Sequence, residues 1–248
     1  MGQLKAVLLS HFPRTGILDL SHGVRAHNIC QAGFFLASSW SYLPKDSIGL
    51  AVIDPGVGTE RSILLFQQGE KSVLVPDNGL LDLLVHRQAD GRIWRIHSRI
   101  MEQRVSSTFH GRDIFAPLAC QLAHGRDPSQ LGAEVSLTEC CRPVFIRPSL
   151  TGGRVKTVVV HVDHFGNCVV NLPAEQWAGY FPKDRPIHLE DPRQESIFPV
   201  STYAQIPESR IGILAGSQGY LELACNQQSC ARHLGLDIGD HVSFAAAD

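Results

Sequence analysis

The spacing of apolar and polar positions divides the chain into two parts with different periods. Over the first 148 residues, segments with apolar side chains three and four positions apart alternate with short, continuous apolar runs. Beyond a stretch rich in glycine and proline at residues 147–153, runs of strand length predominate. We therefore predict two domains, residues 1–148 and residues 154–248.

The first part has the pattern of an α/β layer. Helical spacing is found at residues 2–12, 26–40, 77–87 and 113–125. Continuous apolar runs of strand length are found at residues 47–54, 62–66 and 72–75. Asn28 is placed to cap the second helix. Because strands buried on both faces and separated by helices are typical of βαβ units, we predict an α/β domain with a mostly parallel sheet.

The second part predicts a smaller all-β domain, either a barrel or a sandwich. Apolar runs occur at residues 155–163, 166–172, 211–216, 220–224 and 240–245. Helical signals are restricted to two short segments, near residues 174–178 and 229–234. Several short strands separated by turn residues are typical of such domains.

Composition narrows the class of protein without defining a function. The chain of 248 residues has a formal net charge of −2 and no run of lysine and arginine, which argues against a nucleic-acid surface. No apolar stretch is long enough for a membrane span, and the first residues do not form a signal peptide. The seven cysteines follow no paired or metal-binding spacing, so we predict reduced thiols and a cytoplasmic protein.

An acid stands at the end of the apolar run at residues 47–54, and an arginine follows it seven positions later. Ligands of α/β sheets gather beyond the carboxyl ends of the strands, so Asp54 is expected to face such a crevice. Gly56 and Gly58 let the backbone turn sharply or approach a ligand closely, and the chain then brings Arg61 back beside the acid. The alternative interpretation is a turn aspartate that caps its own loop, with a surface ion pair.

Two further segments place polar side chains ahead of predicted helices. His110 precedes the helix predicted at residues 113–125 and follows a serine- and threonine-rich turn, which suits a residue that faces a cleft. A structural histidine is the alternative. Asp77 and Asn78 are expected to cap the helix predicted at residues 77–87, a role that needs no ligand.

A short loop in the second part combines a carboxylate, an aromatic ring and an amide. Asp163 could bind a cation, Phe165 could stack on a base, and Asn167 could bond to the edge of that base. The alternative is a hairpin turn rich in Asp, Gly and Asn. No metal site is expected, because His161 and Asp163 would share a strand face while His164 points away.

Five motifs follow one another along the chain: DPGVGTxR, PDNGLL, STFHGRDIFAP, DxFGN and GSxGYLELA. Together they resemble the S-adenosyl-L-methionine hydroxide adenosyltransferase family, which is related to the bacterial fluorinases and chlorinases that attack S-adenosylmethionine with halide. The resemblance extends from about Gly2 to the C-terminus. It implies an α/β N-terminal domain, a β C-terminal domain, and a homotrimer with active sites between the N-terminal domain of one subunit and the C-terminal domain of the next.

The resemblance implies hydrolysis of S-adenosylmethionine to adenosine and methionine without a cofactor, with Asp54, Arg61 and His110 around the attacking water. A carboxylate or a neutral imidazole can take a proton from water, and a nearby arginine favours hydroxide and an ionised carboxylate. Either Asp54 or His110 could be the base. A carboxylate at this position would repel a halide ion, which favours water as the nucleophile.

The resemblance also implies binding roles in the second domain. Asp163 would pair with the methionine ammonium group, Phe165 would pack against adenine, and Asn167 would bond to the adenine edge. The methionine carboxylate and the remaining adenine edge are assigned to two turns that contain Ser217, Gln218, Asn226 and Gln227. Some halogenase relatives have arginine where Gln218 stands, so carboxylate binding is expected to depend on hydroxyl and backbone donors.

The N-terminus departs from the family pattern. Family members begin with a strand and a T-D-F-G-like segment whose aspartate binds the ribose hydroxyls, whereas this chain starts at MGQLKAV. If the chain is complete, we expect weaker substrate binding and lower stability. Two alternative functions stay open: a halide-using adenosyltransferase and a non-catalytic protein that binds S-adenosylmethionine or adenosine.

Overall fold

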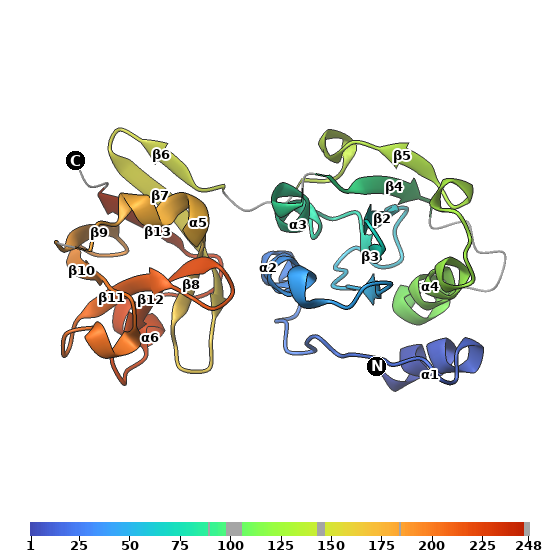
Figure 1. Ribbon diagram of the computed structural model, residues 1–248, viewed down its shortest axis with the longest axis horizontal. Coiled ribbons are helices and arrows are strands. Elements are labelled where there is room, and N and C mark those ends of the chain that lie inside the picture. Colours follow the sequence, from blue (N-terminus) through green and yellow to red (C-terminus); the bar gives the residue numbers. More distant parts are fainter. Residues whose placement is uncertain (89, 98–105, 143–146, 184, 246–248) are drawn as a thin grey trace. The chain divides into compact units, whose positions relative to one another are not determined.

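The computed structural model describes residues 1–88, 90–97, 106–142, 147–183 and 185–245 (Figure 1). The chain divides into two compact units, Met1–Val144 and Phe145–Asp248. Each unit has its own sheet and its own hydrophobic core.

The sheet of the first unit is mixed, and most of its neighbouring strands are antiparallel. Its strands are β1 (Ile48–Leu50), β2 (Ile63–Gln68), β3 (Lys71–Pro76), β4 (Arg92–Ile96) and β5 (Ala133–Val135), in the order β1-β3-β2-β4-β5. Among these described strands, β1 and β3 are the one parallel pair. The predicted mostly parallel sheet is therefore wrong.

The length of one connection explains this difference. Strands β2 and β3 are joined by Gly69 and Glu70 alone, and a parallel crossover needs a dozen or more residues. Gly69 has φ +57°, a left-handed conformation suited to such a tight turn. The predicted strand at residues 47–54 is also shorter than expected, because β1 ends at Leu50 and Asp54 lies in the loop that follows.

Helices cover both faces of this sheet (Figure 1). On one face α2 (Ile29–Ser39) and α3 (Asp82–Arg87) pack on Leu64 and Phe66 of β2. On the other face α4 (Ala116–Ala123) packs on Ile63 and Leu65, and α1 (Gly2–His11) lies against α4. Side chains alternate across a strand, so β2 supplies both layers of the core.

Local capping chemistry places α2 where the sequence predicted it. The side chain of Asn28 accepts a hydrogen bond of 2.9 Å from Gln31 N, which satisfies one of the free amides of the first turn. The predicted cap is thus confirmed.

The second unit is a closed β-barrel. Its strands are β6 (Ser149–Thr151), β7 (Arg154–Val162), β8 (Cys168–Pro173), β9 (Ile187–Asp191), β10 (Glu195–Pro199), β11 (Ile211–Ala215), β12 (Tyr220–Cys225) and β13 (His241–Ala245). They follow the order β13-β9-β10-β11-β12-β8-β7, and pairing of β13 with β7 closes the ring of seven strands. Strand β6 pairs with β7 outside the ring. The predicted all-β domain is confirmed as a barrel, and its short helices α5 (Ala174–Trp177) and α6 (Cys230–Leu234) lie where helical signals were found.

Candidate active site

The loop at residues 54–61 folds back on itself through two tight turns. Val57 N donates a hydrogen bond of 3.2 Å to Asp54 O. Two residues later, Thr59 N donates a bond of the same length to Gly56 O, and the Thr59 hydroxyl adds one of 2.7 Å. These turns return the chain to β2 and bring Arg61 beside Asp54.

Gly58 fixes this loop against a second segment. Its φ is +85°, and a Cβ atom at this position would lie 2.6 Å from Ser107 O. Both the backbone conformation and the contact therefore require glycine. The close approach holds the loop next to the turn that precedes His110.

Asp54 and Arg61 form a buried, bidentate ion pair. Arg61 Nε donates to Asp54 Oδ1 at 2.7 Å, and Arg61 Nη2 donates to Asp54 Oδ2. The two side chains are only 5% and 9% exposed, so the pair is not the surface ion pair of the alternative interpretation. The guanidinium carbon also lies 5.5 Å from the centre of the Phe115 ring. The charge of the buried carboxylate is thus compensated in place.

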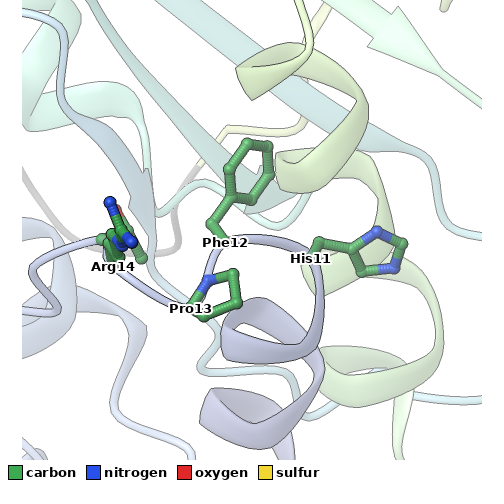
Figure 2. Close-up of a pocket in the computed structure, with 5 residues that line it drawn as sticks. His11, Phe12, Pro13 and Arg14 are labelled. Carbon is green, nitrogen blue, oxygen red and sulfur yellow. The ribbon is translucent and has the colours of Figure 1, made fainter.

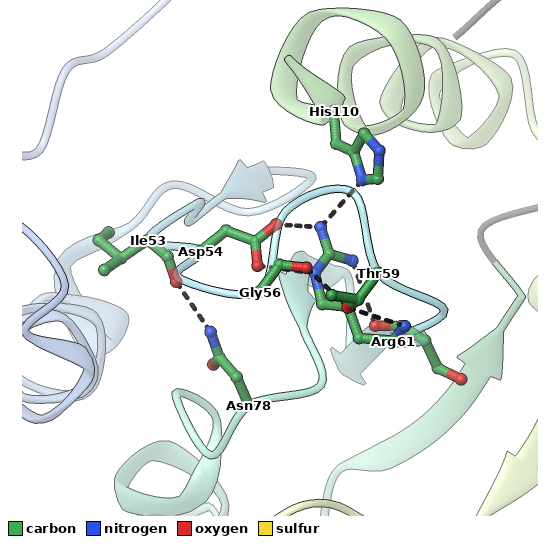
Figure 3. A network of polar contacts seen from close by, with 8 residues as sticks. Ile53, Asp54, Gly56, Thr59, Arg61, Asn78 and His110 are labelled. Carbon is green, nitrogen blue, oxygen red and sulfur yellow. Dashed lines mark hydrogen bonds and ion pairs between the residues drawn. The ribbon is translucent and has the colours of Figure 1, made fainter. Parts of the chain in front are cut away.

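His110 completes the network at the same guanidinium nitrogen that bonds to Asp54 Oδ2 (Figure 3). Its Nδ1 lies 3.3 Å from Arg61 Nη2, and the residue is 6% exposed. A π-helical turn, Gly111–Phe115, begins directly after it and leads into α4. Residues separated by 49 positions in the sequence therefore meet in one polar cluster, which we call the Asp54–Arg61–His110 cluster.

The surroundings of His110 favour its neutral form. Burial lowers the pKa of its imidazole and the charge of Arg61 lowers it further, while Asp54 and Asp113 oppose this effect. Because an arginine N–H can only donate, Nδ1 is the acceptor in this contact. The proton of the neutral ring is then on Nε2, which makes Nε2 a donor.

Asp113 secures the turn that carries His110. Its carboxylate accepts 2.9 Å from Ser106 N and pairs with Arg112 Nε at 2.5 Å. The bond from Arg112, followed by that from Ser106, lowers the pKa of Asp113 to about 2. This carboxylate is thus ionised over the working range of most enzymes and serves as a fixed anchor.

Asn78 has a role that the sequence analysis missed. Helix α3 begins four residues later than Asn78, so Asp77 and Asn78 do not cap it and that expectation is wrong. Instead Asn78 Nδ2 donates to Ile53 O at 2.8 Å, and Asp77 Oδ1 accepts from Cys141 N at 2.7 Å. The amide therefore holds the residue directly before Asp54 (Figure 3).

In the second unit, the loop at residues 163–167 is held by its own carboxylate. Asp163 Oδ1 accepts from Phe165 N at 2.9 Å and from Asn167 N at 2.8 Å, and Oδ2 accepts from Asn167 Nδ2 at 2.9 Å. These bonds form the hairpin turn of the alternative interpretation. They leave the Phe165 ring 76% exposed, whereas Asn167 is buried.

The other predicted binding residues lie on two turns at opposite ends of β12. Ser217 and Gln218 are exposed in the turn between β11 and β12. Asn226 and Gln227 follow the other end of β12, and Gln227 has φ +54°. The six residues of β12 therefore separate the two turns, by roughly 17 Å at the usual rise of a strand.

Glu222 is a candidate site residue that the sequence analysis did not single out. It is buried in the middle of β12, and its Oε1 accepts a hydrogen bond from the Tyr203 hydroxyl. Burial raises the pKa of Glu222, the bond from Tyr203 opposes the rise, and the charge of Asp163 adds to it. Oε2 lies against Gly216, where it leaves no room for a Cβ atom. The sequence feature that could have identified Glu222 is its charge inside the apolar run at residues 220–224.

A surface pocket of about 430 Å³ lies at the end of α1 (Figure 2). It is lined by His11, Phe12, Pro13, Arg14 and Thr15. The Phe12 ring packs on His124, with 4.6 Å between ring centres. The pocket is not lined by the Asp54–Arg61–His110 cluster, so we do not place the chemistry there.

Within the described parts of the chain, no group of three or more His, Cys, Asp or Glu side chains could hold a metal ion. Among the same residues, no helix is long and apolar enough to cross a membrane.

Comparison with known proteins identifies the class to which this fold and cluster belong. Residues 1–132 match the S-adenosylmethionine hydroxide adenosyltransferase N-terminal domain, and residues 157–243 match the C-terminal domain of the same family. The chain belongs to this family. Its predicted resemblance is thus confirmed over both units.

Individual relatives agree with this assignment. An (R)-S-adenosyl-L-methionine hydrolase of Thermus thermophilus is 32% identical over 245 residues, which cover 95% of this chain and 90% of the relative. A protein of the same name from Salinispora tropica is 33% identical, with 97% and 90% covered. The crystal structure of an uncharacterized conserved protein from Thermotoga maritima superposes with a TM-score of 0.86 at 26% identity, and covers 98% of this chain and 94% of that one.

Proposed function

We propose that this protein hydrolyses S-adenosyl-L-methionine to adenosine and L-methionine, by attack of water on the 5′ carbon of the ribose. Family membership and the relatives named as hydrolases support the reaction. The observation that carries the proposal is the buried Asp54–Arg61–His110 cluster, in which a carboxylate, a guanidinium and an imidazole are connected.

The leaving group decides what the site has to supply. Methionine departs as a neutral thioether, so the reaction needs no general acid. It needs a nucleophile held in line with the carbon–sulfur bond, because positioning makes the attack effectively unimolecular. It also needs a group that accepts a proton from water, a contribution of typically about 10²–10⁴-fold.

We propose Asp54 as the proton acceptor. Each of its oxygens accepts one bond from Arg61 and keeps a second lone pair for a water molecule. His110 uses the lone pair of Nδ1 for Arg61, so its Nε2–H is a donor that orients the water rather than a base. Arg61 links the two residues and sets both orientations.

The same cluster favours water over halide. A chloride or fluoride ion at this position would lie beside the Asp54 carboxylate and be repelled by it. Water can donate to the carboxylate and accept from an N–H group, so it suits both neighbours. The halide-using alternative has no such support from the described side chains.

Substrate binding is proposed for the loops of the second unit. Asp163 pairs with the methionine ammonium, Phe165 packs on adenine and Asn167 bonds to the adenine edge. Support comes from the exposed Phe165 ring and from lone pairs that Asp163 retains after its loop contacts. The methionine carboxylate and the adenine edge are assigned to the two turns with Ser217, Gln218, Asn226 and Gln227.

We propose a homotrimer in which the cluster of one subunit works with the binding loops of another. This proposal is supported by the distribution of the functional residues: the proposed base lies in the first unit, and the proposed binding groups lie in the second. Sedimentation equilibrium of the purified chain would give three times the monomer mass, and a monomer with full activity would overturn this part. A cytoplasmic location is also proposed, since all seven cysteines are free thiols.

The reaction is tested by incubating the purified protein with S-adenosylmethionine and excess chloride and separating the nucleoside products. Adenosine supports hydrolysis, 5′-chloro-5′-deoxyadenosine supports the halide alternative, and binding without turnover supports a non-catalytic binder.

Asp54→Asn should lower adenosine formation by about 10²-fold or more with little change in affinity. Glu134→Gln, which alters an exposed ion pair, is the matched control. Full activity of Asp54→Asn would contradict the role of Asp54.

A further inference from the structure

Three thiols of the second unit gather where β12 meets α6. Cys225 is the last residue of β12, and Cys230 is the first residue of α6. Cys168 is the first residue of β8 and pairs with Leu223 of β12. The Cys230 side chain is a hydrogen-bond partner of both Cys168 and Cys225. The thiol of Cys230 is therefore in contact with two others.

The three thiols differ in their access to solvent. Cys168 and Cys230 belong to the barrel core and are fully buried, whereas Cys225 is half-buried at the edge of that core. A solute can thus reach Cys225 first. Two neighbouring thiols with one accessible member form the usual arrangement of an attacking and a resolving cysteine.

Basic side chains surround the accessible thiol. The bond from Cys230, followed by the charges of His233 and Arg193, lowers the pKa of Cys225 to about 7, against burial and Glu195. Glu195 holds both side chains in place, with 3.1 Å to His233 Nε2 and 3.0 Å to Arg193 Nε. The lowered pKa increases the share of Cys225 thiolate, the form that reacts with peroxides.

We propose that Cys225 and Cys230 form a redox-active pair that a hydroperoxide converts into an intramolecular disulfide. The Cys225 thiolate attacks the O–O bond, gains one oxygen as a sulfenic acid and releases hydroxide. Cys230 then attacks this sulfur, the S–S bond replaces the S–O bond, and the departing hydroxide takes the Cys230 proton as water. Two thiols and one hydrogen peroxide thus give one disulfide and two waters.

The pair encloses a turn with a proposed binding role. Residues 226–229 lie between the two cysteines, and Ala231 N donates 2.8 Å to Gly166 O in the loop at residues 163–167. A disulfide would constrain both segments. We expect the oxidised protein to release adenosine more slowly and dithiothreitol to restore the rate. This expectation rests on the proposed function.

Peptide mapping decides the chemistry independently of any activity. The full chain is treated with stoichiometric hydrogen peroxide, blocked with iodoacetamide and cleaved with trypsin without reduction. Residues 211–232 form one tryptic peptide that contains both Cys225 and Cys230, and Cys168 lies in the separate peptide 157–183. The expected result is peptide 211–232 lighter by two hydrogen atoms, with complete loss of this species in Cys225→Ser and in Cys230→Ser. The Cys168→Ala variant should keep it.

Other outcomes would overturn the proposal. A crosslink between the two peptides would place the disulfide at Cys168, and a sulfinic acid on Cys225 without a disulfide would exclude Cys230 as its partner. Cys141 is the internal control for reactivity, because it is more exposed but burial raises its thiol pKa. At pH 7 iodoacetamide should modify Cys225 at least about tenfold faster than Cys141. A disulfide with an unchanged rate of adenosine release would remove the regulatory consequence and keep the redox pair.

Discussion

The two units build their polar clusters in opposite ways. In the first unit, Arg61 joins Asp54, seven positions away, to His110, 49 positions away, and all three have little exposed surface in their side chains. In the second unit, the Asp163 carboxylate bonds to Phe165 and Asn167, two and four positions away, in a loop at the surface. One cluster is made by the fold, and the other is made by a single turn.

This difference predicts different consequences of substitution. A buried charge without its partner destabilises the fold, because the protein interior cannot replace the lost solvation. A loop that satisfies its own bonds can lose an exposed side chain without an effect on folding. We therefore expect changes in the Asp54–Arg61–His110 cluster to affect stability and chemistry together, and changes at the tip of the Asp163 loop to affect binding alone.

The largest effect is expected when the Arg61 guanidinium is removed. In Arg61→Met the Asp54 carboxylate remains buried without its partner, which should cost about 3–5 kcal/mol of unfolding free energy. Urea unfolding of the wild type and the variant measures this loss. Arg92→Met is the matched control, because Arg92 makes the same bidentate contact to Glu134 at an exposed position and its loss should barely move the midpoint. Equal effects of the two substitutions would show that burial does not separate the two ion pairs.

The next effect concerns the contact that holds the loop of Asp54 and Arg61. Gly58→Ala should cost about 2–4 kcal/mol, from left-handed backbone strain plus the clash with Ser107 O. Gly69→Ala serves as control, since that glycine also has positive φ but open space around it, and should cost only about 1 kcal/mol. Urea midpoints give both values. If the two substitutions cost the same, the close approach to Ser107 does not hold the loop.

A smaller effect, confined to binding, is expected in the second unit. Phe165→Ala should weaken adenosine binding by about 1–3 kcal/mol, the usual worth of an aromatic side chain stacked on a base. The melting temperature should not change, because the ring is exposed. Isothermal titration calorimetry and thermal unfolding test both statements. Tyr42→Ala, at an equally exposed aromatic residue of the first unit, should change neither quantity, and unchanged affinity of Phe165→Ala would remove Phe165 from the site.

Local patterns were the most predictable part of the fold. The Asn28 cap, the barrel strands and the short helices of the second unit depend on neighbouring residues, so periodicity and capping chemistry are enough to find them. The strand directions in the first unit depend on the two-residue connection at Gly69 and Glu70. Burial of a strand on both faces does not determine its direction, whereas a two-residue connection permits only an antiparallel pair.

Contacts between distant segments could not be derived from spacing. Asn78 looked like a helix cap, but its amide bonds to Ile53 O, 25 positions away. Glu222 lies in an apolar run that predicts a strand. The pattern of that run does not indicate which side chain bonds to the Glu222 carboxylate. The return of Arg61 beside Asp54 was predicted from the loop itself, whereas the addition of His110 was expected from the family resemblance alone, because no periodicity relates a loop to a turn 49 residues later.

The smallest effect is the dependence of stability on the titration of His110. Its pKa is lowered from the ordinary value of 6.5, chiefly by burial, so the unfolded state binds more protons than the folded state just below pH 6.5. The stability that the neutral form of His110 contributes is fully present above pH 6.5. It is lost as the pH falls toward the pKa of His110 in the folded state. Urea midpoints between pH 7.5 and 5.5 should therefore fall more steeply for the wild type than for His110→Gln, whose side chain does not titrate. Parallel profiles would show that the cluster does not hold His110 in its neutral form, and the donor role proposed for its Nε2–H would lose its support.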